Sequence, residues 1–375
     1  MAISTIPMQG FSQQGINFRN IIINGDMSIA QRGTSSTGIT GNGYFSVDRF
    51  KHIISGLGTW TASQSTDVPT GQGFSNSFKM DCTTADASPA AGDYNILAQI
   101  VEGANVQHLK KGTSSAESIT WSFWVKSNKT GTYICEILDG NNTRQISKSY
   151  TISSSNTWEK KTITMPGDTS GAIGTGASAF LQFNFWLAVG SDRSSGTLNT
   201  SWNSTTNANR AVGQVNLADN TSNEWYITGI QLEAGTTASD FEFLPKDVNL
   251  QRCLRYYEKS YNQDTSPADG LHYNNTITTY QGTVYSTGAI RTLVYFKVPK
   301  RTPPTATFYY VDGLAGGTTA ARWDYWNGSS WVQTNSSTGT GEIEEYAIDI
   351  NVAHSGLTVG YARLVGGGWS VDAEL

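Results

Sequence analysis

Residues 119–126 read Ile119-Thr-Trp-Ser-Phe-Trp-Val-Lys126, and apolar and polar side chains alternate along this stretch. Such a period of two predicts a half-buried β-strand rather than a helix. The apolar face carries four side chains: Ile119, Trp121, Phe123 and Val125. The opposite face carries Thr120, Ser122, Trp124 and Lys126. We therefore expect Trp121 in the core and Trp124 on the other side of the sheet.

Two further stretches have the same period. Residues 180–189 place Leu181, Phe183, Phe185, Leu187 and Val189 on one face, with Phe180 and Trp186 on the other. Residues 224–233 form a third predicted strand, in which Gly229 is a candidate β-bulge. Because Trp124 and Trp186 lie opposite the apolar faces, we interpret them as candidates for a subunit contact or a ligand groove.

Shorter strands fill the rest of the first two thirds of the chain. We predict them near residues 74–82, 94–101, 132–138, 145–152 and 158–165. Frequent strands with almost no helical periodicity are typical of a β-sandwich or jelly roll. The predicted fold class is therefore all-β.

After residue 245 the strand pattern gives way to a short stretch with helical spacing. Residues 248–259 carry apolar side chains at helical spacing, and Asp247 is a suitable N-cap. Strands return at residues 293–298, 307–311, 342–350 and 358–364, and residues 366–375 are predicted to close the chain as an edge strand. This pattern predicts a jelly roll, a short helix and a smaller C-terminal β-sandwich domain.

The composition excludes several classes of function. The net charge is −5, which argues against a nucleic-acid partner. No apolar stretch reaches the ~20 residues that a membrane span needs, so we expect no membrane insertion. The 3 cysteines, Cys82, Cys135 and Cys253, are widely spaced and are expected to be buried free thiols.

The opening of the chain has a different character. Residues 20–33 begin with the apolar run Ile21-Ile22-Ile23 and continue through the turn dipeptide Asn24-Gly25 into a polar, glycine-containing strip. The stretch lacks the charged start, long apolar centre and small-residue cleavage site of a signal peptide. We predict a short strand followed by a sharp turn.

Four segments taken together resemble bacteriophage tail-fibre and virion appendage proteins. They are residues 20–35 with Tyr44 and residues 47–50, then Ser122-Phe-Trp-Val-Lys-Ser127, then residues 229–235 with Phe241-Glu242, and finally residues 249–258. The second and third segments resemble strands of the carbohydrate-binding-module-like jelly rolls in such proteins. The resemblance spans about residues 20–258 and is weaker in the C-terminal domain.

This resemblance implies a non-enzymatic structural protein of the virion surface, forming a homotrimer near the host receptor. The implied organisation is a virion-attachment arm at residues 1–32, a jelly roll at 33–245, a linker helix at 246–260 and a C-terminal β-domain at 261–375. The arm would contact other virion or tail proteins, and its attachment candidates are Ile21, Ile22, Ile23 and Asn24.

We expect neither a cofactor nor a metal. Related jelly rolls often hold a structural calcium with an acidic residue in the last strand, but here that strand reads Tyr226-Ile-Thr-Gly229. Asp26 remains as an oxygen ligand, and calcium prefers 6–8 oxygens. The four histidines are not at metal-ligand spacing, and no nucleophile elbow or phosphate-binding loop is present. We therefore predict no catalytic residues.

Glycan binding needs aromatic planes beside hydrogen-bonding polar groups, and the sequence offers two candidates. One is the predicted hairpin with the turn Asn327-Gly328, which carries Trp323, Tyr325, Trp326, Asn327 and Trp331. The other is Trp202 in a polar loop. Alternatively, the hairpin aromatics stabilise the hairpin itself or face a trimer partner.

Three functions therefore stay open. The first is a tail fibre or related fibre or tip that attaches to host-surface glycan. The second is a polysaccharide depolymerase tailspike, since two of the 30 acidic residues could meet in the fold. The third is a purely architectural virion protein without a receptor role.

Overall fold

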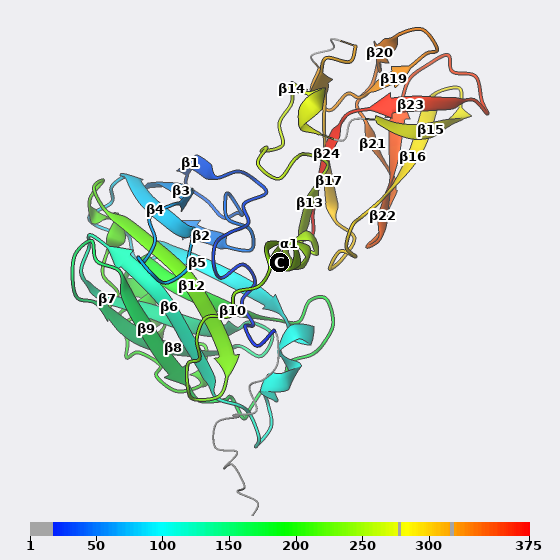
Figure 1. Ribbon diagram of the computed structural model, residues 1–375. Coiled ribbons are helices and arrows are strands. Elements are labelled where there is room, and N and C mark those ends of the chain that lie inside the picture. The colour runs from blue at the N-terminus through cyan, green and yellow to red at the C-terminus, as the bar shows by residue number, and fades with distance from the viewer. Residues whose placement is uncertain (1–17, 277–278, 316–318) are drawn as a thin grey trace, which may run out of the picture.

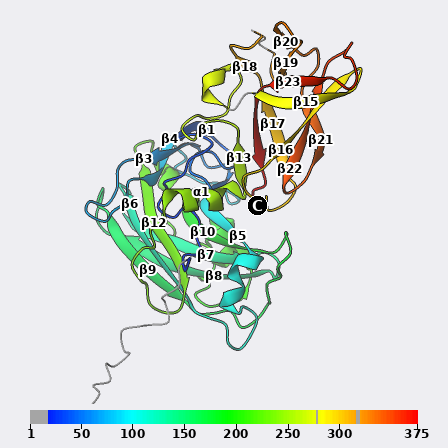
Figure 2. The same cartoon turned by 45° about the vertical axis from the view of Figure 1, so that its right-hand side comes forward.

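The computed structural model describes residues 18–276, 279–315 and 319–375. Two layers of strands form the first domain, and a smaller β-domain follows beyond α1 (Lys246–Leu254), as Figures 1 and 2 show. Within the described residues, every strand pair is antiparallel except that of β14 (Leu271–His272) with β18 (Val311–Asp312). The all-β prediction is confirmed.

Two six-stranded sheets pack face to face in the first domain, which we call the body. Sheet A runs in the order β1 (Ser35–Ile39), β3 (Thr59–Ser65), β4 (Ser77–Thr84), β12 (Glu224–Ala234), β6 (Ile119–Ser127) and β9 (Glu159–Met165). Sheet B runs in the order β11 (Asn203–Ser204), β8 (Arg144–Ile152), β7 (Gly131–Asp139), β10 (Phe180–Val189), β5 (Tyr94–Glu102) and β2 (Lys51–Ser55).

The alternating residues of β6 and β10 form the core between these sheets. Phe185 of β10 packs against Trp121 and Phe123 of β6, with ring centroids 4.8 and 5.1 Å apart. Rings at such distances add to the burial energy of the aromatic side chains. The predicted faces of β6 and of residues 181–187 are confirmed. Val189 is the exception, because the register shifts between Trp186 and Ala188 and places Val189 in the outer cluster with Trp186. The bulge is confirmed as well, since the register with β6 shifts between Thr228 and Gln231 and Gly229 has φ +61°.

A second, smaller cluster covers the outer face of sheet B. Trp186 is fully buried there against residues such as Ile134 and Ala211, and its Nε1 donates to Glu136 Oε2 over 3.1 Å. Ala211 belongs to the connection between β10 and β12, which folds back over the sheet. The expectation that Trp186 lines a subunit contact or groove is therefore wrong, because the chain itself covers this side chain.

The C-terminal domain consists of two main sheets. A three-stranded sheet has the order β13 (Tyr257–Lys259), β24 (Gly368–Asp372) and β17 (Thr305–Tyr309). A seven-stranded sheet has the order β20 (Trp331–Gln333), β19 (Asp324–Trp326), β23 (Ala362–Gly366), β15 (Thr279–Ser286), β16 (Ala289–Tyr295), β22 (Ala347–Ala353) and β21 (Gly339–Ile343). Their apolar faces share a core that includes Trp323 and Trp369.

Two elements near the domain boundary differ from the prediction. The helix begins one residue before Asp247 and ends at Leu254, and residues 257–259 form β13 instead of the last helical turn. Tertiary pairing of β13 with β24 outweighs the local helical period there. The closing segment is also not an edge, because β24 is the central strand of its sheet.

Candidate functional site

The opening segment packs inside the body and forms its connection to the second domain. Asn24, at φ +61°, fixes the predicted turn. Its Nδ2 donates to the carbonyl oxygens of Ile29 and Asp48 over 2.9 and 3.0 Å, and its Oδ1 accepts from the Ile29 N–H. The sharp turn is confirmed, but residues 20–23 form no strand.

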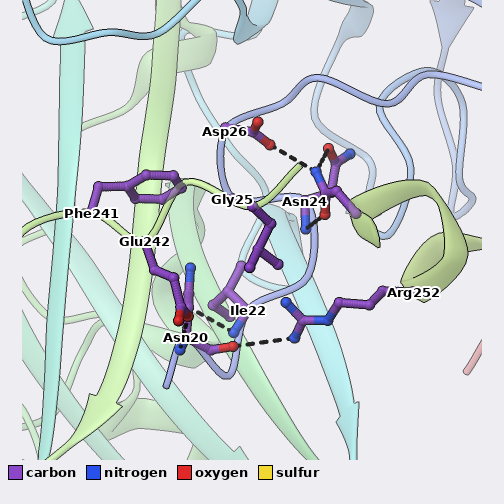
Figure 3. A pocket seen from close by; sticks show the side chains of 10 residues that line it. Asn20, Ile22, Asn24, Gly25, Asp26, Phe241, Glu242 and Arg252 are labelled. Atoms are coloured by element: carbon purple, nitrogen blue, oxygen red, sulfur yellow. Dashed lines mark hydrogen bonds between the residues drawn. The ribbon is translucent and has the colours of Figure 1, made fainter. Parts of the chain in front are cut away.

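The helix α1 binds to this turn. Asn249 Nδ2 donates to Asp26 Oδ1 and to Ser28 Oγ, both over 3.0 Å, and its Oδ1 accepts from the Asn24 N–H. Figure 3 shows this region, with Arg252 of α1 donating to the Asn20 carbonyl. The pit between these residues has a volume of only about 10 Å³, which is room for a single water molecule. It is too small for an organic ligand.

Polar contacts continue from the opening segment to β13. Gln31 Nε2 donates to Asp48 Oδ2 over 2.6 Å and to the Tyr257 carbonyl over 3.0 Å, and Lys259 Nζ donates to the Gln31 carbonyl over 2.7 Å. Burial raises the pKa of Asp48 and lowers the pKa of Lys259 to about 8. Both side chains are removed from water, since Asp48 and Lys259 are each 1% exposed.

Two arginines of the opening region bind the last residues of the chain. Arg49 is fully buried, lies 3.4 Å from the centroid of the Tyr256 ring and pairs with Glu374. Arg32 pairs with Asp372 over 2.8 Å and with Glu374 over 3.5 Å. We call this whole set the joint: Asn24, Asp26, Gln31, Arg32, Asp48 and Arg49 from the body, with Asn249, Lys259, Asp372 and Glu374 from the helix and second domain.

The joint corrects the prediction of an attachment arm at residues 1–32. The proposed contact residues Ile21, Ile22, Ile23 and Asn24 are only 5, 2, 4 and 1% exposed, so they are core positions without a free surface. Ile21 and Ile22 belong to the same apolar core as the two sheets. The part of the prediction that concerns residues 1–17 lies outside the described residues.

The predicted hairpin forms, but it does not present all of its aromatic residues. Trp326 pairs directly with Trp331 across β19 and β20, with the rings 5.9 Å apart and partly buried. Asn327 is exposed, and its Oδ1 accepts from two backbone N–H groups of the turn. Trp323 is fully buried and Tyr325 is 8% exposed, so these two are core residues of the C-terminal domain.

Trp202 has a structural setting as well. Its Nε1 donates to the Pro166 carbonyl over 2.7 Å, and its ring lies 5.4 Å from Lys111 Nζ. The side chain is partly buried and packs on the edge of the body core. The structure does not bring Trp202 near the hairpin tryptophans, because Trp202 belongs to the body and the hairpin belongs to the second domain.

The structure instead places Trp124 in a pocket of about 320 Å³ on the outer face of sheet A. We call it the aromatic pocket. Small-molecule sites commonly begin near 300 Å³ and combine apolar walls with a few polar groups. The pocket is lined by Gly71, Gln72, Phe74, Ser122, Trp124, Lys160, Gly229, Asp240, Phe241 and Phe243.

Three phenylalanines from two loops make one wall of the aromatic pocket. The ring centroids of Phe74, Phe241 and Phe243 lie 4.8 to 5.1 Å apart, and Phe243 is 51% exposed. The Gly229 bulge leaves room for this cluster, because a Cβ atom at residue 229 would come within 2.5 Å of Phe74 Cζ. The backbone at Gly229 also has a positive φ that favours glycine.

The charged groups of the aromatic pocket are free, unlike those around it. On the neighbouring surface of sheet A, Lys126 pairs with Asp67, and Trp158 donates to the same carboxylate over 2.9 Å. In the described part of the chain, neither the Asp240 carboxylate nor the Lys160 ammonium has an ion pair or a side-chain hydrogen bond. Both are exposed beside the aromatic rings.

The sequence pattern predicts Ser122 and Trp124 on the face opposite the core and Gly229 as a bulge, and all three line this pocket. It does not predict the three phenylalanines. Phe74, Phe241 and Phe243 lie in loops, where neither the helical nor the strand period operates. The alternating Phe241-Glu242-Phe243 beside a bulged strand is the only signal that the sequence offered for them.

The described residues contain neither a metal-binding cluster nor a membrane-spanning helix, and their cysteines are unpaired. No group of three or more histidine, cysteine, aspartate or glutamate side chains there is arranged to hold a metal ion. None of the helices in the described ranges has the length and apolar character needed to cross a membrane. Cys82, Cys135 and Cys253 are buried free thiols, which confirms that prediction.

The chain matches no known family model and no curated protein. Similar solved structures include the enzymatically active domain of tailspike protein 4 from bacteriophage CBA120, at 14% identity and a TM-score of 0.31, over 58% of this chain and 21% of that one. They also include CBM4, at 13% identity and a TM-score of 0.28, over 56% of this chain and 97% of that one.

A third similar structure is the family 11 carbohydrate-binding module from Clostridium thermocellum in complex with a mixed-linked tetrasaccharide. It shares 13% identity at a TM-score of 0.25, over 55% of this chain and 99% of that one. This chain thus spans about a fifth of the tailspike and nearly the whole of the two modules. Identities and TM-scores this low carry no functional argument. Any ligand site therefore rests on the chain's own residues.

Proposed function

We propose that this chain is a structural protein of a phage virion appendage, a tail fibre or a related fibre or tip, that attaches to host-surface glycan through the aromatic pocket. The observation that carries the glycan part is the combination of Trp124 and three phenylalanines with the unpaired Asp240 and Lys160. The virion part rests on the resemblance of residues 20–258 to appendage proteins. Neither part involves catalysis, and we propose no enzymatic activity.

The pocket has the chemistry that sugar binding requires. A pyranose ring has an apolar C–H face that packs on an aromatic plane, and Trp124 is large and partly exposed. The sugar hydroxyls need donors and acceptors that are not already used, and Lys160, Asp240 and Gln72 supply them at the rim. A single such site binds weakly, so a homotrimer would gain affinity by presenting three sites to one surface.

Substitution of the aromatic wall tests this function. Trp124→Ala should lower the affinity for host-surface polysaccharide by about fivefold or more, because removal of an aromatic anchor costs about 1 kcal/mol or more. Binding is measured by glycan array and by isothermal titration calorimetry on the full chain. Circular dichroism should show unchanged folding, since Trp124 lies opposite the core.

The hairpin provides the matched control. Trp326→Ala removes a tryptophan of similar exposure from the second domain. If Trp326→Ala abolishes binding and Trp124→Ala does not, the glycan site lies on the hairpin and the assignment to the aromatic pocket fails. If neither variant changes the binding, the glycan site lies elsewhere and the assignment to the aromatic pocket fails. If no host polysaccharide binds, the protein is architectural. Release of reducing sugar during the same incubation would contradict a non-enzymatic role.

Location and symmetry need separate measurements. Antibody labelling of phage particles in electron microscopy should place the chain on the tail or an appendage. Analytical ultracentrifugation should give a trimer. A monomer at micromolar concentration, or a label on the capsid, would contradict this part of the proposal.

A further inference from the structure

A second cavity of about 330 Å³ lies where the opening segment meets α1 and the short 3₁₀-helix η1 (Gly103–Leu109). We call it the arginine pocket. Its polar lining consists of Asn20, Asn105, His108, Arg252, Arg255 and Tyr256. It is larger by far than the pit of Figure 3, although Arg252 contributes to the walls of both.

The two arginines of this pocket differ in their partners. Arg255 is paired with Glu102 through two hydrogen bonds of 2.8 Å, and these bonds raise the pKa of Arg255. Arg252 donates one hydrogen bond of 3.2 Å to the Asn20 carbonyl, and burial lowers the pKa of its guanidinium. No carboxylate among the described residues forms an ion pair with Arg252.

Among the described residues, the carboxylate that acts on Arg252, that of Glu242, is already engaged. Glu242 acts on Arg252 only at longer range, because its two carboxylate oxygens accept the backbone N–H groups of Phe18 and Asn20 over 2.7 and 2.9 Å. Residues 1–17, which precede the pocket in the chain, contain no aspartate or glutamate. A guanidinium always carries its charge and presents several donors, so the remaining donors of Arg252 suit an external anion.

We propose that the arginine pocket binds the carboxylate of an acidic sugar, such as a uronic acid residue in a host polysaccharide. Arg252 holds the carboxylate by charge-assisted hydrogen bonds, and Asn105 and His108 at the exposed rim bind the ring hydroxyls. The volume of about 330 Å³ accommodates one pyranose ring with its carboxylate. This inference rests on the proposed glycan-binding function and adds a charge preference at a second site.

The test uses histidine ring signals in NMR spectra of the full chain, since His108 lies at the pocket and only four histidines are present. The probes are methyl β-glucuronide, the neutral methyl β-glucoside and acetate. The glucuronide should shift the His108 signal and bind about tenfold more tightly than the glucoside, because a hydrogen bond to a charged group is stronger than a neutral one. Acetate should bind more weakly than the glucuronide, since it lacks the ring hydroxyls.

Two variants separate charge from folding. Arg252→Gln should reduce the affinity for the glucuronide by about tenfold or more, whereas Arg252→Lys keeps the charge and should retain part of it. Should Arg252→Gln fail to fold, Asn105→Ala at the exposed rim gives a second readout, with a several-fold loss for the glucuronide and none for acetate.

Specific outcomes overturn the proposal. They are an unchanged His108 signal in the presence of glucuronide, equal binding of glucuronide and glucoside, equal binding of glucuronide and acetate, or full affinity in Arg252→Gln. Each leaves the proposed function intact as long as polysaccharide still binds in a Trp124-dependent manner. If the wild-type chain binds glucuronide at Arg252 but no host polysaccharide, the proposed role of the aromatic pocket is instead rejected.

Discussion

The joint and the aromatic pocket are both rich in polar and aromatic side chains, but they differ in whether the polar groups have partners. In the joint, Asn24, Gln31 and Asp48 are nearly fully buried and hydrogen-bonded to one another or to backbone groups. In the aromatic pocket, Asp240 and Lys160 are exposed, and their charges are unpaired within the described ranges of the chain. Most buried polar groups find partners because an unsatisfied group costs free energy, so a network of buried hydrogen bonds and ion pairs indicates a structural role. Free groups beside an aromatic wall are the basis of the proposed ligand site.

This difference changes the role that the sequence predicts for the opening segment. The opening motif resembles a family signature, and this resemblance predicts an attachment arm. Its side chains in fact hold the body, the helix and the second domain together. The distinctive motif is therefore a connection between domains, and the binding candidate lies in ordinary-looking loops.

The largest effect is expected from breaking the joint. Glu374→Gln leaves the buried Arg49 without its counter-charge, and loss of one partner of a buried ion pair costs about 3–5 kcal/mol. Differential scanning calorimetry should show a clearly lower melting temperature. Asp372→Asn is the matched control, because its side chain is 44% exposed and should cost less than about 1 kcal/mol. Equal effects of the two substitutions would mean that the joint is not a buried network.

The next effect concerns the shape of the aromatic pocket. Gly229→Ala places a methyl group within 2.5 Å of Phe74 at a positive φ, which should cost about 2–4 kcal/mol from strain and overpacking. Chemical denaturation measures the loss, and glycan binding should fall with it. Gly38→Ala is the control, since its φ of +70° is similarly positive but no atom lies within 4 Å of the added Cβ. A milder effect at residue 229 than at 38 would contradict the role of the bulge.

His52 differs from the polar groups of both regions, because it is buried but has no hydrogen-bond partner among the described residues. Burial lowers the pKa of His52 to about 3, and neither ring nitrogen has a hydrogen-bond partner among the residues that the structure describes. Between pH 6.5 and 3 the unfolded chain binds the extra proton, so stability falls as the pH falls through that window. At pH 4.5 this term amounts to about 2–3 kcal/mol.

His52→Leu should remove that term. The variant should lose less stability than the wild type between pH 7 and 4.5, as measured by urea unfolding at each pH. All carboxylates are shared by the two proteins, so the difference isolates His52. Parallel pH profiles would show that His52 is not buried in its neutral form.

The smallest effect on stability is expected for the free charges of the aromatic pocket. Asp240→Asn should change the unfolding free energy by less than about 0.5 kcal/mol, because an exposed group without a partner contributes little. The same substitution should weaken glycan binding several-fold in calorimetry, by loss of a charged acceptor. A large drop in stability with unchanged binding would place Asp240 in a structural network like that of the joint.

The sequence by itself determined the elements whose signal is local. The period of two assigned the strands around Trp121 and Phe185 and their core faces, Gly229 marked the bulge, and Asn327-Gly328 marked the hairpin that pairs Trp326 with Trp331. These features follow from backbone geometry over a few residues, which repeats wherever the same pattern occurs.

Only the tertiary structure decided which residues meet across the chain. Arg49 finds Glu374 and Phe74 finds Phe241 over long sequence separations, and no periodic pattern encodes such pairs. The same holds for β13, where pairing with β24 replaces the last helical turn, and for Trp186, which the chain covers with its own connection. Burial is a property of the packed chain. The sequence could therefore place a side chain on one face of a strand, but not decide whether that side chain is exposed to solvent, buried in the joint or part of a pocket.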